Sequence, residues 1–275
     1  MEHIESLKKH YSNRDIKHRI LEGLEKAGKD LKHLSVDDLA VFDEFHLGGR
    51  IETRKLAQIA GIKQGDRVLD VGAGVGGPAR TLAVEYGCQV IGIELSEDLC
   101  LGGNFLSELV GLKDRVELIC GNALELPFED NSFDVVWTQH VSMNIEAKAI
   151  FYREIYRVLK PGGRLAFHDI FKGSVEGLNF PVFWASQESH SFVVKPEETQ
   201  EVLKTCGFEE LVWQDVTQET KKMAEKGKAL LNREQLPPLS IHIVVPEEAP
   251  LKAANMLKNL EEERTLVVKA VYQKR

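Results

Sequence analysis

Residues 67–80 read RVLDVGAGVGGPAR, and this stretch decides the fold. The apolar run from Val68 to Val71 contains β-branched residues and predicts a short strand that is buried on both faces. The glycines between Gly72 and Gly77 allow positive φ and let a ligand approach the backbone closely. From Pro78 onward the pattern becomes helical. A strand, a glycine turn and a helix N-terminus in this order predict a nucleotide-like ligand at the carboxyl end of a parallel sheet.

Two acidic residues favour a ligand other than a dinucleotide. Asp70 precedes the first glycine, where a carboxylate suits a cationic ammonium group better than a pyrophosphate. Gln89–Ile93 predicts a second strand, and Glu94 follows it, about twenty residues beyond Gly74, where an acidic side chain can accept hydrogen bonds from both ribose hydroxyls. No arginine follows Glu94 to receive a 2′-phosphate. An adenosine with a positively charged tail therefore fits the pattern better than NADP does.

The composition limits the classes of partner. The chain has 275 residues, of which 43% are hydrophobic, so it can bury a sizeable core. Its net charge of −8 argues against binding to a phosphate backbone, and no nucleic-acid partner is expected. The start is polar and no run of 18 apolar residues occurs, so a soluble cytoplasmic protein without a membrane span is expected. The cysteines lack a CxxC pair, which favours a reducing compartment and buried thiols over a metal site or disulfides: Cys88, Cys100, Cys120 and Cys206.

Residues 1–50 are predicted to form a helical lid. Apolar residues recur three or four positions apart, as on one face of a helix, in two sets: Ile4, Leu7 and Tyr11, then Ile16, Ile20 and Leu24. Ser35 followed by Asp38 resembles a capping box, so a further helix should begin there.

The predicted lid ends in FDEFHLGG, residues 42–49. Bulky aromatic residues beside a glycine pair suit a flexible cover over a ligand. The alternative is that Phe42 and Phe45 only pack the lid onto the core. A lone histidine such as His46 is more often structural than functional.

Strands and helices alternate through the rest of the chain. Further strands are expected at Val116–Cys120, Phe133–Trp137, Arg164–His168, Leu211–Val216 and Leu266–Gln273. Helices are expected at residues 51–60, 98–110, 147–159, 195–206, 218–232 and 250–263, whereas Ser240–Val245 fits either a strand or an extended linker. This alternation predicts an α/β, Rossmann-like three-layer sandwich over residues 51–275, with cover insertions at about 170–194 and 218–262.

Four motifs in this order resemble class I S-adenosylmethionine-dependent methyltransferases. They are DVGAGVGG followed by Glu94, NALELPF at residues 122–128, NSFD at 131–134 and RVLKPGG at 157–163. The resemblance covers roughly residues 65–170. It implies a seven-stranded, mostly parallel sheet with the last strand antiparallel, S-adenosylmethionine as cofactor, S-adenosylhomocysteine as product, and no metal.

The resemblance also implies which residues contact the cofactor. The glycine turn (Gly72, Ala73 and Gly74) would lie against the methionine part, beside Asp70, and Glu94 would hold the ribose. Leu95 would flank the adenine, and Asn122 with Ala123 would meet the adenine edge, although Asn122 could instead only form the turn. Gln139 would face the methionine part.

A narrower resemblance concerns the acceptor. WTQH at residues 137–140 and the FDEFHLGG segment look similar to the group that contains sarcosine/dimethylglycine and phosphoethanolamine N-methyltransferases. This implies methyl transfer to the nitrogen of a small amine such as sarcosine or dimethylglycine. Relatives of the glycine betaine pathway often carry an acidic residue at position 140, where this chain has His140.

An amine acceptor must lose a proton, and histidine has an unperturbed pKa near neutrality. His140 is therefore the first candidate for orienting or deprotonating the acceptor, and His46 is the second; alternatively, both only pack or hydrogen-bond in the pocket. Phe183, Trp184 and His190 are candidates for an aromatic acceptor wall that would attract a methylated ammonium. Simple packing is the alternative for these side chains.

Several rival functions share these features. An O- or C-methyltransferase of a quinone, lipid precursor or other apolar molecule would have the same core, a larger and more apolar pocket, and no carboxylate-binding arginine. Arsenic methylation would need grouped thiolates, which the scattered cysteines do not offer. A NAD-dependent dehydrogenase and a non-catalytic cofactor-binding protein are alternatives of other classes. The acceptor, the number of methyl groups transferred and the oligomeric state stay open.

Overall fold

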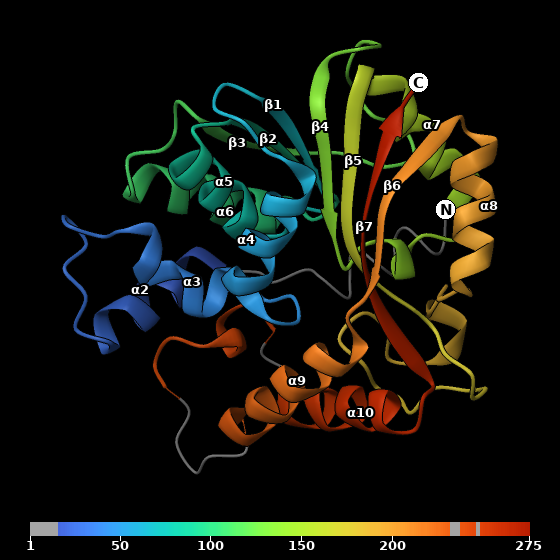
Figure 1. Cartoon of the computed structure of the whole chain (residues 1–275). Coiled ribbons are helices and arrows are strands. Elements are labelled where there is room, and N and C mark those ends of the chain that lie inside the picture. The colour runs from blue at the N-terminus through green and yellow to red at the C-terminus, as the bar shows by residue number, and fades with distance from the viewer. Residues whose placement is uncertain (1–15, 232–236, 246–247) are drawn as a thin grey trace.

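A computed structural model describes residues 16–231, 237–245 and 248–275 of the chain (Figure 1). A seven-stranded sheet runs through them in the order β3-β2-β1-β4-β5-β7-β6. The strands are β1 (Arg67–Val71), β2 (Gln89–Glu94), β3 (Val116–Cys120), β4 (Phe133–Gln139), β5 (Leu159–Lys172), β6 (Phe208–Asp215) and β7 (Thr265–Lys274). The first five strands pair in parallel, and β7 is antiparallel to both β5 and β6. The predicted Rossmann-like sheet with an antiparallel last strand is confirmed.

Helices cover both faces of this sheet (Figure 1). One face carries α4 (Gly49–Ala60), α5 (Gly77–Tyr86) and α6 (Glu97–Leu109), and the other carries α7 (Lys148–Val158) and α8 (Pro196–Thr205). Neighbouring strand residues face opposite layers: Val68 and Trp137 pack under α4 to α6, whereas Leu69 and Val136 pack under α7. The central strands are therefore buried on both faces, as their apolar runs predict.

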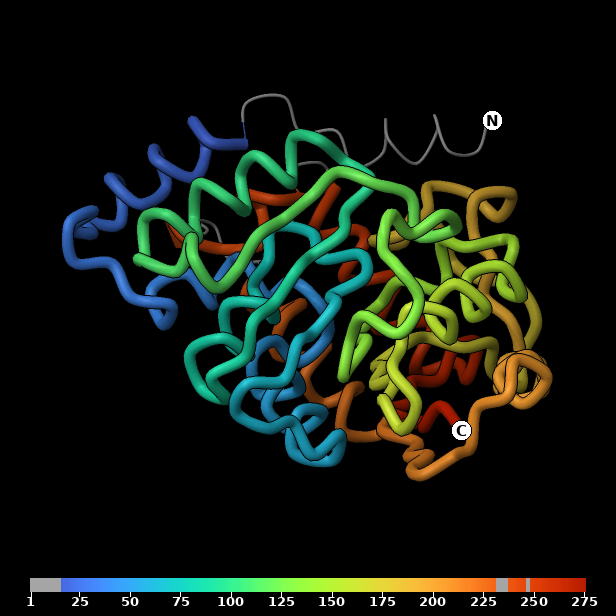
Figure 2. Tube along the Cα trace, turned by 90° about the horizontal axis from the view of Figure 1, so that it is seen from above, coloured from blue at the N-terminus to red at the C-terminus, as the bar shows by residue number. Residues whose placement is uncertain are grey.

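A smaller apolar cluster joins the N-terminal helices to α6. It contains residues of α2 (Ile16–Lys26), α3 (Val36–Asp43) and the short 3₁₀ helix η3 (Ile241–Ile243). The predicted capping box is present, because the Asp38 carboxylate accepts hydrogen bonds from the backbone N–H (2.9 Å) and the hydroxyl (2.7 Å) of Ser35. In the view from above, α2 and the C-terminus lie on opposite sides of the molecule (Figure 2). The predicted helix face of Ile4, Leu7 and Tyr11 lies outside the described residues.

Two helices cross the end of the sheet where the parallel strands finish. These are α9 (Thr217–Leu231) and α10 (Ala249–Glu261), which pack together at the bottom of Figure 1. Ala224 of α9 and Met256 of α10 share an apolar cluster with Ile170 of β5 and with Trp184. The helices and the segment around residue 184 thus form one cover over the strand ends. The division into a lid of residues 1–50 and a domain from residue 51 stays a prediction.

Two segments differ from the expected structure. β5 extends from Leu159 to Lys172, well beyond the predicted Arg164–His168, because Leu159 pairs with Phe133 of β4 and because β7 pairs with the strand from Arg164 to Lys172. A local pattern does not reveal this distant partner. Residues 240–245 contain the 3₁₀ helix η3 rather than a strand, because Ile243 and Val244 pack into the α2–α3 cluster. Within the described residues, no helix is long and apolar enough to cross a membrane.

Candidate functional site

A cavity of about 510 Å³ lies at the carboxyl ends of the parallel strands. Its floor consists of residues that follow β1, β2, β3 and β4, and its roof consists of the α3–α4 turn (residues 43–48), residues 183–184, α9, η3 and α10. This volume lies in the usual range for a small-molecule site. The topology therefore brings segments from both ends of the chain around one chamber.

All nine predicted cofactor contacts line this cavity. They are Asp70, Gly72, Ala73, Gly74, Glu94, Leu95, Asn122, Ala123 and Gln139. Their roles toward a cofactor stay predictions, but their common location follows from the sheet: each lies at the carboxyl end of a parallel strand or just after it.

The glycine turn and Glu94 are fixed to each other by hydrogen bonds. The Gly74 N–H donates to Glu94 Oε2 (3.0 Å), and the Ser96 N–H donates to Glu94 Oε1 (3.0 Å). Gly72 has a φ of +74°, and a Cβ placed there would lie 2.4 Å from a methyl carbon of Val141. A side chain at position 72 would therefore be strained and would also collide with the loop after β4. A carboxylate has about four acceptor sites, so Glu94 can still accept a ligand hydroxyl beside its backbone donors.

Asp70 lacks a partner that its charge requires. The side chain is buried, and its Oδ2 has no hydrogen-bond donor in the described structure. Burial raises the pKa of Asp70 to about 8, and repulsion from Glu44 and Glu94 adds to the shift. A cationic ligand would relieve both effects. The ammonium and sulfonium groups of S-adenosylmethionine satisfy this requirement, so the residues present fit this cofactor.

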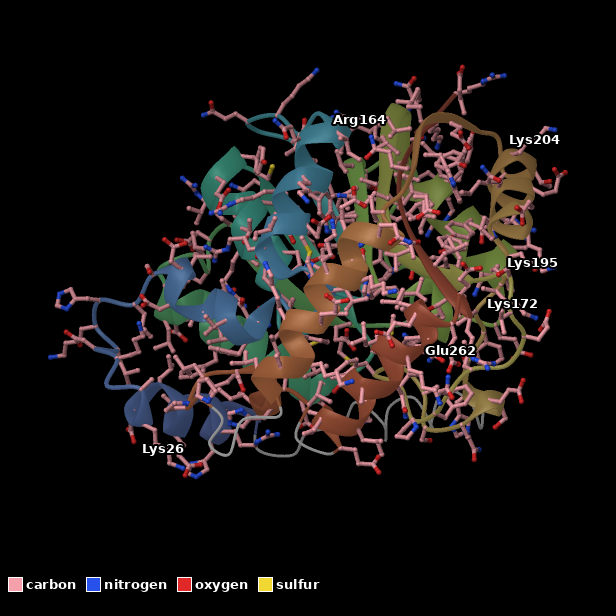
Figure 3. The ribbon with its side chains drawn as sticks, turned by 60° about the horizontal axis from the view of Figure 1, so that its bottom comes forward. Lys26, Arg164, Lys172, Lys195, Lys204 and Glu262 are labelled. Carbon is pink, nitrogen blue, oxygen red and sulfur yellow. The ribbon has the colours of Figure 1, made fainter. Side chains whose placement is uncertain are left out.

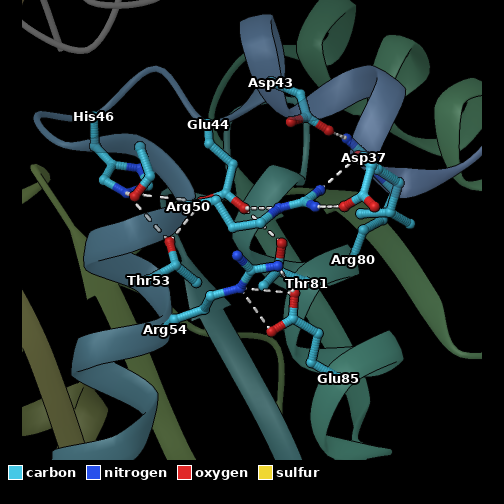
Figure 4. Close-up of polar contacts among 12 residues, drawn as sticks. Asp37, Asp43, Glu44, His46, Arg50, Thr53, Arg54, Arg80, Thr81 and Glu85 are labelled. Carbon is cyan, nitrogen blue, oxygen red and sulfur yellow. Dashed lines mark hydrogen bonds and ion pairs between the residues drawn. The ribbon is translucent and has the colours of Figure 1, made fainter.

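Glu44 is a further buried carboxylate in the cavity wall, and sequence reasoning missed it (Figure 4). Its oxygens accept hydrogen bonds from the hydroxyls of Thr53 (2.6 Å) and Thr81 (2.5 Å) and from Nε of Arg50 (3.4 Å). These contacts tie the α3–α4 turn to α4 and α5. Its sequence clue is the FDEFH run, where an acidic residue sits between aromatic residues that were expected to be buried.

Phe42 and Phe45 were expected either to cover a ligand or to pack the lid onto the core. Phe42 is buried in the α2–α3 cluster and also reaches the cavity, whereas Phe45 is only partly buried and lines the cavity. The Asp43 carboxylate pairs with Arg80 at 2.8 Å, and both side chains are fully buried (Figure 4). The lid thus packs onto the core and faces the chamber at once.

Asn122, which follows β3, and Gln139, which ends β4, differ in which of their polar atoms already have hydrogen-bond partners. Asn122 Oδ1 accepts a hydrogen bond from the Leu124 N–H (3.0 Å), which is the turn-forming role considered for this residue. Gln139 Oε1 accepts a hydrogen bond from Trp137 Nε1 (2.9 Å), and its buried Nε2 has no partner. The orientation of the Gln139 side chain is therefore fixed by Trp137, and one amide donor is left for a ligand.

Both predicted histidines line the cavity, and a third histidine lies beside them. The ring centroids of His46 and His140 are 6.1 Å apart, and the His168 centroid lies 4.9 Å from that of His140. Burial lowers the pKa of His140 to about 3 and that of His46 to about 4, so both rings are neutral at pH 7. No group of three or more His, Cys, Asp or Glu side chains within the described ranges is arranged to hold a metal ion.

The acceptor side of the cavity is apolar. Phe183 and Trp184 line it as predicted, whereas His190 is not among the lining residues. Its remaining walls are mostly aliphatic or sulfur-containing side chains: Val41, Leu47, Met143, Ile145, Ile170, Met223, Ala224, Leu230, Ile241, Val245, Ala253 and Met256. Within the described part of the chain, the lining includes no arginine and one lysine, Lys228.

Other surface lysines lie away from this chamber. Lys172, Lys195 and Lys204 lie along the rim beside β5 and α8, whereas α9 and α10 cross the middle of the same view (Figure 3). None of these three residues lines the cavity. They do not supply the positive charge that an anionic acceptor would need.

Comparisons with known proteins agree with this geometry. Residues 69–167 match a family described as methyltransferase domain. The chain is 34% identical over 167 residues to a sterol 24-C-methyltransferase of Saccharomyces cerevisiae, a match that covers 58% of this chain and 44% of the yeast protein. The match thus spans less than half the length of this curated relative.

Solved structures share the fold at lower identity. Geranyl diphosphate C-methyltransferase from Streptomyces coelicolor A3(2) superposes with a TM-score of 0.72 at 18% identity, over 100% of this chain and 98% of that one. A protein described as a sarcosine dimethylglycine methyltransferase from Galdieria sulphuraria gives a TM-score of 0.68 at 21% identity, over 91% and 96% of the two chains. The match of residues 69–167 to a methyltransferase domain agrees with the order of the sheet and with the residues at its strand ends.

Proposed function

We propose that the protein transfers a methyl group from S-adenosylmethionine to a carbon atom of an uncharged, largely apolar small molecule. The observation that carries this proposal is the acceptor wall, which is built mainly from aliphatic, aromatic and methionine side chains and, among the described residues, includes no arginine. Such a wall was expected for an apolar acceptor rather than for a small amine. The similarity to a sterol 24-C-methyltransferase supports the same choice.

The chain's carboxylates would hold the cofactor. Asp70 and Glu44 provide negative charge beside the glycine turn, and Glu94 offers free lone pairs toward the ribose. When bound, S-adenosylmethionine supplies an electrophilic methyl group on a sulfonium. The cover would position the acceptor carbon and exclude water, which accounts for much of the acceleration in a direct displacement.

The site is poorly suited to the small amines that sequence reasoning favoured. Sarcosine and dimethylglycine carry a carboxylate and phosphoethanolamine carries a phosphate, and Lys228 is the one lining cation in the described residues. An ammonium acceptor also needs a base that titrates near neutrality. Burial keeps the pKa values of His140 and His46 far below that range.

Neutral imidazoles suit C-methylation better. A carbon nucleophile that gains a methyl group must lose a proton, and the C–H bond of the methylated, electron-deficient acceptor is strongly acidic. A neutral ring with a low pKa can accept that proton, although it cannot deprotonate an ammonium efficiently. The His140 ring lines the cavity; its Nε2 is buried without a hydrogen-bond partner, so Nδ1 is the nitrogen left for this role.

The test is a labelling experiment with methyl-labelled cofactor. The panel should contain a sterol with a side-chain carbon–carbon double bond, a quinol, a phenol, sarcosine and dimethylglycine. We expect the label on a carbon of an uncharged compound, located by mass spectrometry and NMR. Label on nitrogen or oxygen, or labelling confined to the amines, would contradict the proposal.

A further inference from the structure

His168 lies directly behind the cavity wall and is absent from its lining. The residue belongs to β5, and its exposed fraction is 0%. Its Cα pairs with that of Gln139 in the neighbouring strand, and its carbonyl accepts a hydrogen bond from the His140 N–H at 2.8 Å. The His168 ring therefore lies next to His140, one layer farther from the acceptor.

Both ring nitrogens of His168 are buried without a hydrogen-bond partner, as is Nε2 of His140. Buried polar atoms are nearly always paired, and an unpaired one lowers the stability of the fold. The two ring centroids are 4.9 Å apart and the ring planes are inclined by 56°. Rotation about the bond to each ring can therefore bring one nitrogen of each within hydrogen-bond distance, because this torsion is broad for histidine.

The backbone at His140 adds an independent observation. Its φ is +56°, in the left-handed region that residues with a Cβ rarely adopt. Such strain persists where the surrounding structure imposes it, often at functional positions. Here the strained turn keeps the His140 ring between the chamber and His168.

Charged groups surround the pair on several elements. His46 Nε2 lies 3.8 Å from Glu44 Oε2, on the chamber side. Behind the rings, Lys269 of β7 is buried and donates to Glu52 of α4 at 2.5 Å, and Glu52 also pairs with Lys55. Burial lowers the pKa of His168 most, and His140, His46, Lys269 and Lys55 add to that shift; burial also lowers the pKa of His46, against the opposite effects of Glu52 and Asp43. His140 Nε2 and both nitrogens of His168 have no partner in the described residues, so no ion pair holds a proton at these atoms.

We propose that His168 acts through His140 by sharing the proton that C-methylation releases, an inference that rests on the proposed function. In this step a C–H bond of the methylated acceptor breaks, its electron pair fills the electron-deficient carbon, and the proton passes to Nδ1 of His140, whose buried Nε2 already carries a proton. A nitrogen of His168 then accepts a hydrogen bond from the protonated ring. The proton is held away from the acceptor until it leaves to solvent. His168 does not touch the acceptor.

The test follows the histidine rings by NMR in the ligand-free, ¹⁵N-histidine-labelled protein, from pH 7.5 down to the onset of acid unfolding. His168→Phe keeps a buried ring but removes its nitrogens, and His168→Asn keeps a polar side chain. We expect His140 to take up its proton at a pH at least about one unit higher in the natural protein than in His168→Phe, with partial recovery in His168→Asn. Should His168→Phe fail to fold, His168→Asn gives the midpoint of His140 without the second ring, and the reciprocal His140→Phe gives the midpoint of His168 without its neighbour.

Thr138→Val is the matched control. Thr138 is buried with an unpartnered Oγ1, but strand alternation places it on the opposite face of β4 from Gln139. This change should leave the His140 titration unaltered. An equal or higher midpoint in His168→Phe, or no titration of the natural protein before unfolding, would overturn the inference. The result does not depend on an acceptor, so a failure of the proposed function in the labelling experiment is recognised separately.

Discussion

The cofactor side and the acceptor side of the cavity are built in different ways. The cofactor side comes from the strand ends between residues 70 and 140 and carries the carboxylates of Asp70 and Glu94, with buried Glu44 of the α3–α4 turn nearby. The acceptor side is assembled from separate segments, within residues 41–47, 143–147, 183–184, 223–230, 240–245 and 253–256, whose side chains are mainly apolar. The comparison indicates that cofactor chemistry is encoded locally, in one motif-rich stretch, whereas acceptor choice depends on the tertiary arrangement of separate segments.

We expect the largest loss of stability from a substitution in the glycine turn. Gly72→Ala is expected to lower the free energy of unfolding by about 3 to 4 kcal/mol, the sum of left-handed strain and a close contact with Val141. Urea unfolding of the ligand-free protein measures this change.

Gly111 provides the matched control for that substitution. It has a φ of +70°, but a Cβ placed there would meet nothing within 4 Å. Gly111→Ala should therefore show the strain alone, about 1 to 2 kcal/mol. Gly72→Ala with Val141→Ala should recover the contact component, and equal losses in the two single variants would refute the contact with Val141.

A substitution of Asp70 should weaken cofactor binding and, at high pH, increase the stability of the ligand-free protein. Asp70→Asn is expected to weaken S-adenosylmethionine binding by about 100-fold, because it removes the buried charge opposite the cation. The raised pKa means that the folded, ligand-free protein binds this proton more tightly than the unfolded chain does. Its stability therefore falls as the pH rises from about 4 toward 8, and Asp70→Asn should be more stable than the natural protein at pH 9.

Calorimetric titration and thermal unfolding test the two halves of that prediction. Glu97→Gln, an exposed change in the first turn of α6, serves as the control and should alter neither quantity. Normal cofactor affinity in Asp70→Asn would contradict the role given to this carboxylate.

Substitutions in the cover should change kcat/KM for the acceptor but not the affinity for the cofactor. Ala224 lines the cavity on α9, whereas Ala229 on the same helix is exposed and does not line it. Ala224→Phe is expected to reduce kcat/KM for an apolar acceptor by about 10- to 30-fold through overpacking of the chamber, with cofactor affinity within about twofold. Ala229→Phe should change neither. An unchanged kcat/KM in Ala224→Phe would argue that the acceptor binds elsewhere.

Cofactor binding should also depend on pH. Because the pKa of Asp70 is about 8 in the ligand-free protein, binding of a cation requires loss of that proton. Between about pH 5.5 and 7.5, where the ligand's amino group stays protonated, the affinity should rise by up to about tenfold per pH unit. Asp70→Asn should abolish this slope. A pH-independent affinity in the natural protein would show that Asp70 is already ionised without ligand.

Much of the sheet could be predicted from the sequence because its strands are short apolar runs bounded by turn residues. Val116–Cys120 matches β3, and Gln89–Ile93 is one residue shorter than β2. The extension of β5 to Lys172 could not be predicted, because it depends on pairing with β7 about a hundred residues later. The 3₁₀ helix η3 likewise depends on packing against α2 and α3.

In the candidate site, too, some residues could be located from the sequence and others could not. Asp70, Glu94 and Gln139 could be located from the sequence because each follows or ends a recognisable strand. His168 was placed correctly at a strand, but its position behind His140 depends on the register between β4 and β5. The contributions of Met223 and Met256 could not be anticipated, because helix periodicity does not reveal which cavity a helix will cover.

The most direct test of the account is a competition between two acceptors in one reaction with labelled S-adenosylmethionine. An unsaturated sterol and sarcosine should be present at equal concentration, and the ratio of their kcat/KM values follows from the label in each product. The account predicts that the label enters a carbon of the uncharged compound, with a ratio of at least about 100 in its favour. Preferential labelling of the sarcosine nitrogen would contradict it.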